Sequence, residues 1–374
     1  MNPIRLRGPA DLLVTLPYQL GYHLEDCLVV LALHGGRAAL MERIDLPPAA
    51  LAADVAAQLA APLLRESPDE VVLAAYERDA GSAVPLVDAL AEELTRAGID
   101  RLKHLVVRDG RWYHPGCDDG CCPAAGLALP APADTPAVAD FVALEMAPLP
   151  SRGSLACVVG ADHAVCRDVA AALAGPVLWP GRAGGRPSDS EPVSADAHRR
   201  AVERLFRLSL WARVCDVTVT ARPVDELSPG DVAELVRSLQ DRALRDGVIA
   251  RLCPGTLPLE ALDEDLADAV RTSIREPAWG PRGGAAGGAA ALATRRLLAR
   301  LQWLARAVPD EHCAGVLTVL GSVAWWLGEG SLARVAVERA LEHTPGYTLA
   351  RLLEQMLDHG LRPGGAGTAP ALSA

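Results

Sequence analysis

Residues 27–46 read CLVVLALHGGRAALMERIDL, two apolar runs joined by His-Gly-Gly-Arg. Valine and leucine dominate the first run, which predicts a buried β-strand over residues 27–33. The pair Gly35-Gly36 can adopt the positive φ angles of a two-residue turn, so residues 38–46 are expected to return as the second strand of a hairpin.

The chain after this hairpin alternates between helical and extended patterns. Apolar residues have helical spacing over residues 51–64 and 84–97, and short apolar runs typical of strands cover residues 70–76 and 102–107. This alternation predicts right-handed crossovers and a mixed sheet covered by helices. We therefore expect an α/β N-terminal domain over residues 1–180.

The second half of the chain is expected to be all-α. A segment rich in Gly, Arg, Pro and Ser at 181–194 is predicted to link the first domain to a helical domain at 195–374, with a flexible tail from about residue 361. Residues 314–347 have the spacing of one tetratricopeptide-like helical hairpin. The pattern has no convincing second copy upstream, whereas a repeat array needs several stacked units.

The composition argues against nucleic-acid binding. The formal net charge is −11 at pH 7, whereas binding to a phosphate backbone needs a clustered Lys/Arg surface. Lys103 is the single lysine in a chain rich in Ala, Gly, Pro and Arg, which indicates a high-GC bacterial genome. A protein partner or a small anionic ligand is the expectation, and the oligomeric state stays open.

No segment predicts export or membrane insertion. The first ten residues contain no long apolar run after their arginines, so no signal peptide is expected. The longest nearly apolar stretch, residues 314–327, is too short to cross a bilayer. The expected location is the cytoplasm, where most of the nine cysteines would be buried thiols.

Several separate stretches together carry a resemblance to a known family. They are residues 16–30 (LPYQLGYHLEDCLVV), 43–47 (RIDLP), 111–113 (RWY), 121–123 (CCP) with Gly126, 150–152 (PSR) and 333–350. With these stretches the chain resembles the uncharacterised bacterial domain of unknown function 4192. The resemblance supports the fold outline and implies no activity. Cys27 stands where the family pattern more often has serine, which argues against a hydroxyl nucleophile there.

The open end of the hairpin is the first candidate site. If the two glycines form the turn, paired residues have numbers that sum to about 71, so Asp45 lies opposite Asp26 and Arg43 opposite Leu28. All four side chains would then share one face. Two opposed carboxylates are unfavourable without a cation, and Arg43 would supply it.

Two interpretations of this strand end stay open. It could be a ligand pocket in which Arg43 binds an anion and Asp26 or Asp45 acts as a base, or an ion-paired hairpin end that fixes the preceding loop. Arg152 follows Ser151, a typical helix cap, and could also bind an anion. The ligand-binding candidates are His23, Glu25, Asp26, Arg43, Asp45 and Arg152.

The second candidate is a loop with His114, Cys117, Cys121 and Cys122. Thiolate and imidazole groups so close in sequence could hold a structural zinc ion tetrahedrally, with His104 as an added ligand. Adjacent cysteines are an unusual ligand pair, and no Cys-x-x-Cys motif completes the set. A labile disulfide and plain packing of the cysteines are the alternatives.

Standard catalytic signatures are missing from the sequence. It contains no Gly-x-Ser-x-Gly elbow, Walker loop or His-Glu-x-x-His helix, and catalytic residues remain unknown. The leading hypothesis is a noncatalytic ligand- or protein-binding regulatory protein whose helical domain contacts a partner. The alternatives are an enzyme that uses Asp26, Arg43 and Asp45, with His23, on a small anionic substrate, and a protein with a structural zinc loop.

Overall fold

A computed structural model of the chain describes two compact units. The described residues are 6–117, 122–177, 193–280, 288–361 and 363. The N-terminal unit ends at Ser154, and the second begins at Leu155. The linker predicted at 181–194 lies almost wholly outside the described residues, as does most of the tail predicted from residue 361. Within the described residues, every helix is too short or too polar to cross a membrane.

The sheet of the N-terminal unit contains the predicted hairpin. Strand β1 (Cys27–His34) pairs antiparallel with β2 (Arg37–Asp45). The turn between them consists of Gly35 and Gly36, whose φ angles of 58° and 73° lie in the region that glycine adopts without steric cost. The hairpin and its two-residue turn are therefore confirmed.

One extra residue in β2 interrupts the regular pairing. Beside the turn Leu33 lies opposite Ala38, but the next pair is Ala32 with Leu40, which leaves Ala39 without an opposite residue in β1. This β-bulge shifts every later pair by one residue. The predicted register is correct beside the turn and wrong beyond the bulge, because a pair of alanines carries no sequence signal for a bulge.

The remaining strands complete the mixed sheet that the sequence predicts. They are β3 (Glu70–Tyr76), β4 (Leu102–Arg108), β5 (Arg111–Tyr113) and β6 (Leu127–Ala128). The strand order is β2-β1-β3-β4-β5-β6, with β3 and β4 parallel and the other neighbours antiparallel. The single parallel pair is joined by a helix, as a crossover requires.

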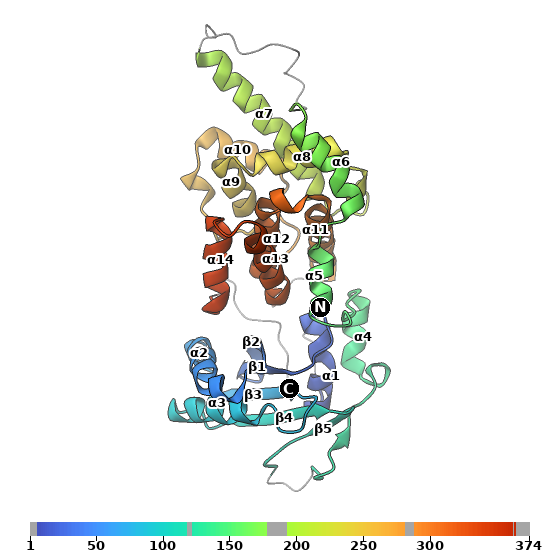
Figure 1. Cartoon of the computed structure of the whole chain (residues 1–374), viewed down its shortest axis with the longest axis vertical. Helices are drawn as coiled ribbons and strands as arrows, with labels where there is room; N and C mark the ends of the chain where they lie inside the picture. The colour runs from blue at the N-terminus through green and yellow to red at the C-terminus, as the bar shows by residue number, and fades with distance from the viewer. Residues whose placement is uncertain (1–5, 118–121, 178–192, 281–287, 362, 364–374) are drawn as a thin grey trace. The chain divides into compact units, whose positions relative to one another are not determined.

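Helices pack on both faces of this sheet. They are α1 (Pro9–Leu20), α2 (Ala52–Arg65), α3 (Val84–Arg96) and α4 (Pro136–Ala143), with α2 and α3 side by side (Figure 1). Leu28 and Val30 of β1 belong to the core that includes α2 and α3, whereas Val29 and Leu31 belong to the core that includes α1. Alternate residues thus enter opposite cores, which is why β1 is apolar throughout.

The second unit consists of helices, as predicted. They are α5 (Gly153–Val159), α6 (His163–Ala174), α7 (Val193–Val214), α8 (Pro229–Ser238), α9 (Arg242–Leu252), α10 (Glu264–Ser273), α11 (Gly288–Ala307), α12 (Ala314–Trp326), α13 (Gly330–His343) and α14 (Thr348–Asp358). α6 packs against α8 and α11, so this helix belongs to the second unit although it precedes the predicted linker.

Helices α12 and α13 form a closely packed hairpin, and α14 packs against both. A Cβ atom at Gly321 would lie 3.3 Å from a methyl group of Val337 and 3.2 Å from one of Leu353. The absence of a side chain at this position therefore allows the helices to approach.

A buried ion network joins three helices of this unit. The carboxylate of Glu234 on α8 is fully buried and accepts hydrogen bonds from Arg207 Nε of α7 (3.3 Å) and Arg237 Nη1 (2.6 Å). Arg237 Nη2 also donates to three carbonyl oxygens at the end of α6, those of Ala172, Leu173 and Gly175. One carboxylate thus connects α7 and α8 to α6.

Candidate functional site

The β-bulge changes which residues meet at the open end of the hairpin. Asp45 lies opposite Cys27 and Arg43 opposite Val29, one residue away from the predicted partners Asp26 and Leu28. The prediction that Asp26 and Asp45 face each other is therefore wrong. Since opposite residues point to the same face, Arg43 and Asp45 share the face of Cys27 and Val29.

The predicted group divides into two separate clusters. Asp26 has a positive φ of 43° and accepts a hydrogen bond from the backbone N–H of Arg78 (3.0 Å). The Arg78 guanidinium pairs with Glu25 (2.7 Å) and Asp26 (3.4 Å). All three side chains are exposed, so this cluster fits the ion-paired loop of the second interpretation. Arg78 was missed because it is distant in sequence and belongs to no motif.

A short pairing brings the segment around Arg152 to the same end of the sheet. The backbone N–H of His23 donates to Leu149 O (2.9 Å), and Leu149 N–H donates to Gly21 O (2.8 Å). Two stretches that carry the family resemblance, residues 16–30 and 150–152, are thereby held together. The side chain of His23 itself is exposed.

Arg43 is the centre of the second cluster, which we call the arginine cluster and define as Arg43, Asp45 and Arg152. The Arg43 side chain is only 9% exposed, and its Nη1 lies 2.5 Å from Asp45 Oδ1. Arg152 Nη1 lies 3.5 Å from Asp45 Oδ2. Asp45 is 64% exposed and Arg152 is 36% exposed, so the cluster opens to solvent above a buried guanidinium.

One hydrogen-bond donor of the arginine cluster, an N–H group of Arg43, has no acceptor within the described part of the chain. Arg43 Nε is buried and has no hydrogen-bond partner among the described residues. A buried N–H without an acceptor costs about 1–3 kcal/mol. The three charged groups of the cluster sum to one positive charge, so the surplus donor and the surplus charge both favour an anionic ligand.

Two titratable groups of the neighbouring strands, Cys27 opposite Asp45 and Tyr76 opposite Cys27, are neutral. Burial raises the pKa of the Cys27 thiol, and the positive charge of the Arg43 guanidinium opposes this effect only in part. Burial likewise raises the pKa of Tyr76 well above its ordinary value, and the Tyr76 hydroxyl donates to Leu13 O (2.7 Å). At neutral pH Cys27 is therefore a protonated thiol and not an activated nucleophile.

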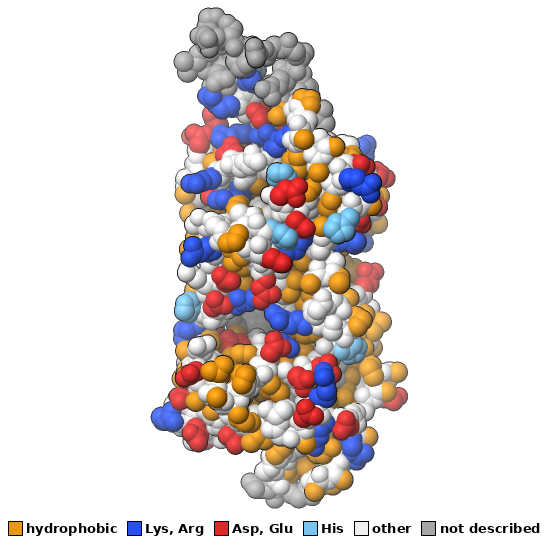
Figure 2. All heavy atoms as spheres, viewed as in Figure 1, with side chains coloured by type: hydrophobic (Ala, Val, Ile, Leu, Met, Phe, Trp, Pro, Cys, Tyr) orange, Lys and Arg blue, Asp and Glu red, His pale blue; other side chains and the backbone are white. Residues whose placement is uncertain are grey.

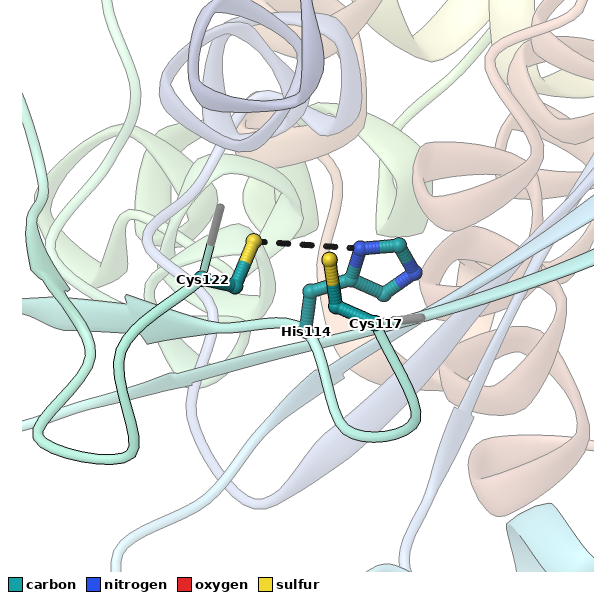
Figure 3. Close-up of side chains that lie close together, drawn as sticks. All are labelled: His114, Cys117 and Cys122. Carbon is teal, nitrogen blue, oxygen red and sulfur yellow. Dashed lines mark hydrogen bonds between the residues drawn. The ribbon is translucent and has the colours of Figure 1, made fainter. Parts of the chain in front are cut away.

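The His/Cys loop brings three of its predicted ligands together. One ligand atom each from His114, Cys117 and Cys122 lies within 4.8 Å of the others, and Cys122 Sγ lies 4.0 Å from His114 Nδ1 (Figure 3). Cys121 lies outside the described residues. His104 is on β4 and does not belong to this group, and burial lowers the pKa of its imidazole.

Gly126 fixes the returning arm of this loop. Its φ is +70°, and an added Cβ would lie 2.6 Å from the Tyr113 ring and 2.9 Å from Trp112 O. Gly126→Ala is therefore expected to lower the free energy of unfolding by about 2–4 kcal/mol, since a strained φ and overpacking act together. Urea unfolding measures this change.

Gly98→Ala is the matched control for this substitution. Gly98 has a φ of +90°, but an added Cβ would meet nothing within 4 Å. Only the backbone strain of about 1–2 kcal/mol is expected. Equal losses for the two variants would contradict the close contact at Gly126.

The chain is a two-unit protein with an α/β unit, a helical unit and two clusters of side chains that could bind a ligand or a metal ion. The family model described as "Domain of unknown function (DUF4192)" matches residues 9–364, nearly the whole chain. The chain therefore belongs to this family, and the resemblance drawn from its motifs is confirmed. Searches of curated proteins and of solved structures gave no match.

Proposed function

We propose that this chain is a noncatalytic, cytoplasmic binding protein that takes a small anionic ligand at the arginine cluster. The observation that carries the proposal is the buried guanidinium of Arg43, 9% exposed, with a second guanidinium at its exposed rim and an unpartnered Nε. A buried cation with surplus donors is the usual arrangement for binding a carboxylate or a phosphate.

In the free protein the Asp45 carboxylate occupies the position on the two arginines that we propose for the anionic ligand. Its two carboxylate oxygens contact Arg43 and Arg152, as the oxygens of a bound carboxylate or phosphate would. Because Asp45 is 64% exposed, its exchange for an external anion costs little desolvation. Acidic and basic side chains are interspersed over the visible face of the molecule, which also supports a small anion over a polyanion (Figure 2).

An enzyme that acts on a small anionic substrate at the same cluster is the second candidate. The exposed carboxylate of Asp45 beside two guanidinium groups is the observation in its favour. Against it, both oxygens of Asp45 are engaged by arginines, and the raised pKa of Cys27 removes the nearby thiol as a nucleophile. Turnover of a metabolite by the purified protein would replace the binding proposal with this one.

Inorganic phosphate tests the proposal, with the thermal midpoint of unfolding as the measurement and chloride holding the ionic strength constant. Phosphate at 100 times its Kd is expected to stabilise the wild type by about 2.7 kcal/mol. Arg43→Gln and Arg152→Gln should lose this stabilisation, and Asp45→Asn should gain affinity because it removes the competing anion.

Arg78→Gln is the matched control, since Arg78 is an exposed, ion-paired arginine of the other cluster. It should respond to phosphate as the wild type does. The same response in all five proteins, or none in the wild type, would overturn the proposal. If Arg43→Gln fails to fold, the substitution of the partly exposed Arg152 still tests the proposal.

The tetratricopeptide-like character of the α12–α13 hairpin is part of the same proposal. Support comes from the spacing of its small residues and from the close helix approach at Gly321. In this proposal the helical unit contacts a protein partner. A stable complex that co-purifies with the full chain would support this role, and its absence would contradict it.

A further inference from the structure

The connection between β5 and β6 has two arms that carry thiol and imidazole groups. On the outgoing arm His114 directly follows β5, and a turn in which Cys117 N–H donates to His114 O (3.3 Å) brings Cys117 back beside it. Gly116, with a φ of 75°, makes this turn. Cys122 comes from the returning arm, so the three side chains meet from two segments (Figure 3).

The bases of the two arms are fixed independently of these side chains. Trp112 of β5 pairs with Leu127 of β6. Arg111 Nε donates to Ala125 O (2.8 Å) and Nη2 to Gly126 O (2.8 Å). The ligand-type groups are thus held near one another by the backbone, which lowers the conformational entropy that a bound ion would have to remove.

We propose that His114, Cys117 and Cys122 bind one zinc ion that joins the two arms. With Zn–S near 2.3 Å and Zn–N near 2.0 Å, neighbouring ligand atoms of a tetrahedral site lie about 3.5–3.8 Å apart. The Cys122 Sγ to His114 Nδ1 separation is 4.0 Å, and all three ligand atoms lie within 4.8 Å of one another. Shifts of about 1 Å or less therefore complete three corners of the tetrahedron.

The ligand types select zinc over other ions. Two thiolates and one imidazole suit a borderline-soft ion, whereas Ca²⁺ and Mg²⁺ take oxygen ligands. Binding releases the protons of both thiols, and the two thiolates then balance the charge of the ion, which leaves the site neutral. Three protein ligands leave a fourth position for a water molecule or a further side chain.

Cys117 distinguishes this site from two alternatives. A nucleophilic thiol activated by an imidazole would need only Cys122 and His114, so this alternative does not explain why Cys117 lies beside them. A disulfide would need only Cys117 and Cys122, and gives His114 no role. Among the described residues this is also the only group of three metal-binding side chains within such distances. The inference is independent of the arginine cluster.

Metal analysis of the purified full-length protein by mass spectrometry tests the inference. We expect close to one zinc per chain in the wild type, and a loss of zinc affinity of about 10–100-fold or more in Cys117→Ser and in Cys122→Ser. Cys157→Ser is the matched control because Cys157 is an exposed cysteine of α5 outside the group. It should keep its zinc.

A second measurement keeps the inference testable if the cysteine variants do not fold. Treatment of the wild type with a chelator should lower the thermal midpoint of unfolding, and added zinc should restore it. Zinc-free wild type, zinc retained in both variants, a Cys117–Cys122 disulfide in protein purified under reducing conditions, or rapid alkylation of Cys122 by iodoacetamide would each overturn the inference.

Discussion

Glu234→Ala is expected to lower the free energy of unfolding of the helical unit by about 3–5 kcal/mol. It leaves the largely buried guanidinium of Arg237 without its carboxylate, and it removes one of the two carboxylates, Glu203 and Glu234, that pair with Arg207. Glu234 is fully buried between Arg207 and Arg237. The loss of the charge also weakens the position of Arg237, which holds the end of α6 through three carbonyl oxygens. Urea unfolding followed by circular dichroism measures the change.

Asp268→Ala is the matched control for the buried network. Asp268 pairs with Arg271 at 2.9 Å, but the two side chains are 68% and 40% exposed. Exposed pairs contribute at most about 1 kcal/mol. If Glu234→Ala costs no more than Asp268→Ala, the buried network does not stabilise the fold.

Trp211→Ala is expected to destabilise the same unit by about 3–5 kcal/mol, since it leaves a cavity the size of an indole. Trp211 on α7 is fully buried, and its Nε1 donates to Ser238 Oγ of α8 (2.9 Å). The substitution also leaves the buried hydroxyl of Ser238 with one hydrogen bond fewer. Differential scanning calorimetry should show a lower unfolding midpoint.

Trp325→Ala provides the comparison, because Trp325 is only half-buried and its Nε1 donates to Leu361 O at the surface. It should lower the midpoint much less than Trp211→Ala. Equal shifts would mean that the indole of Trp211 is not an essential part of the core.

The sequence predicts the hairpin, the mixed sheet and the helical second half because each depends on local patterns. The glycine pair specifies the turn, and the period of the apolar residues separates strands from helices. The β-bulge at Ala39 depends instead on how β2 packs over its whole length, and no local pattern signals it. One unpredicted residue was enough to change the partners of Arg43 and Asp45.

The two candidate sites were predictable to different degrees, because the residues of one are close in sequence and those of the other are not. His114, Cys117 and Cys122 lie within nine positions of one another, so their proximity could be read from the chain. The contact between Asp45 and Arg152 spans 107 positions and depends on the pairing near Leu149, which only the fold reveals. Tyr76, which lies opposite Cys27 in the sheet, was likewise not predicted as part of the site, because a tyrosine in an apolar strand carries no special signal.

The bulge also bears on the fidelity of folding. A hairpin that formed without it would slip by one residue and turn Arg43 and Asp45 into the core that α2 and α3 cover, while Ile44 and Leu46 would leave that core. Burial of a guanidinium among aliphatic side chains is far more costly than its burial beside Cys27 and an exposed carboxylate. Arg43, which we propose binds the ligand, thus also disfavours the incorrect register of β2.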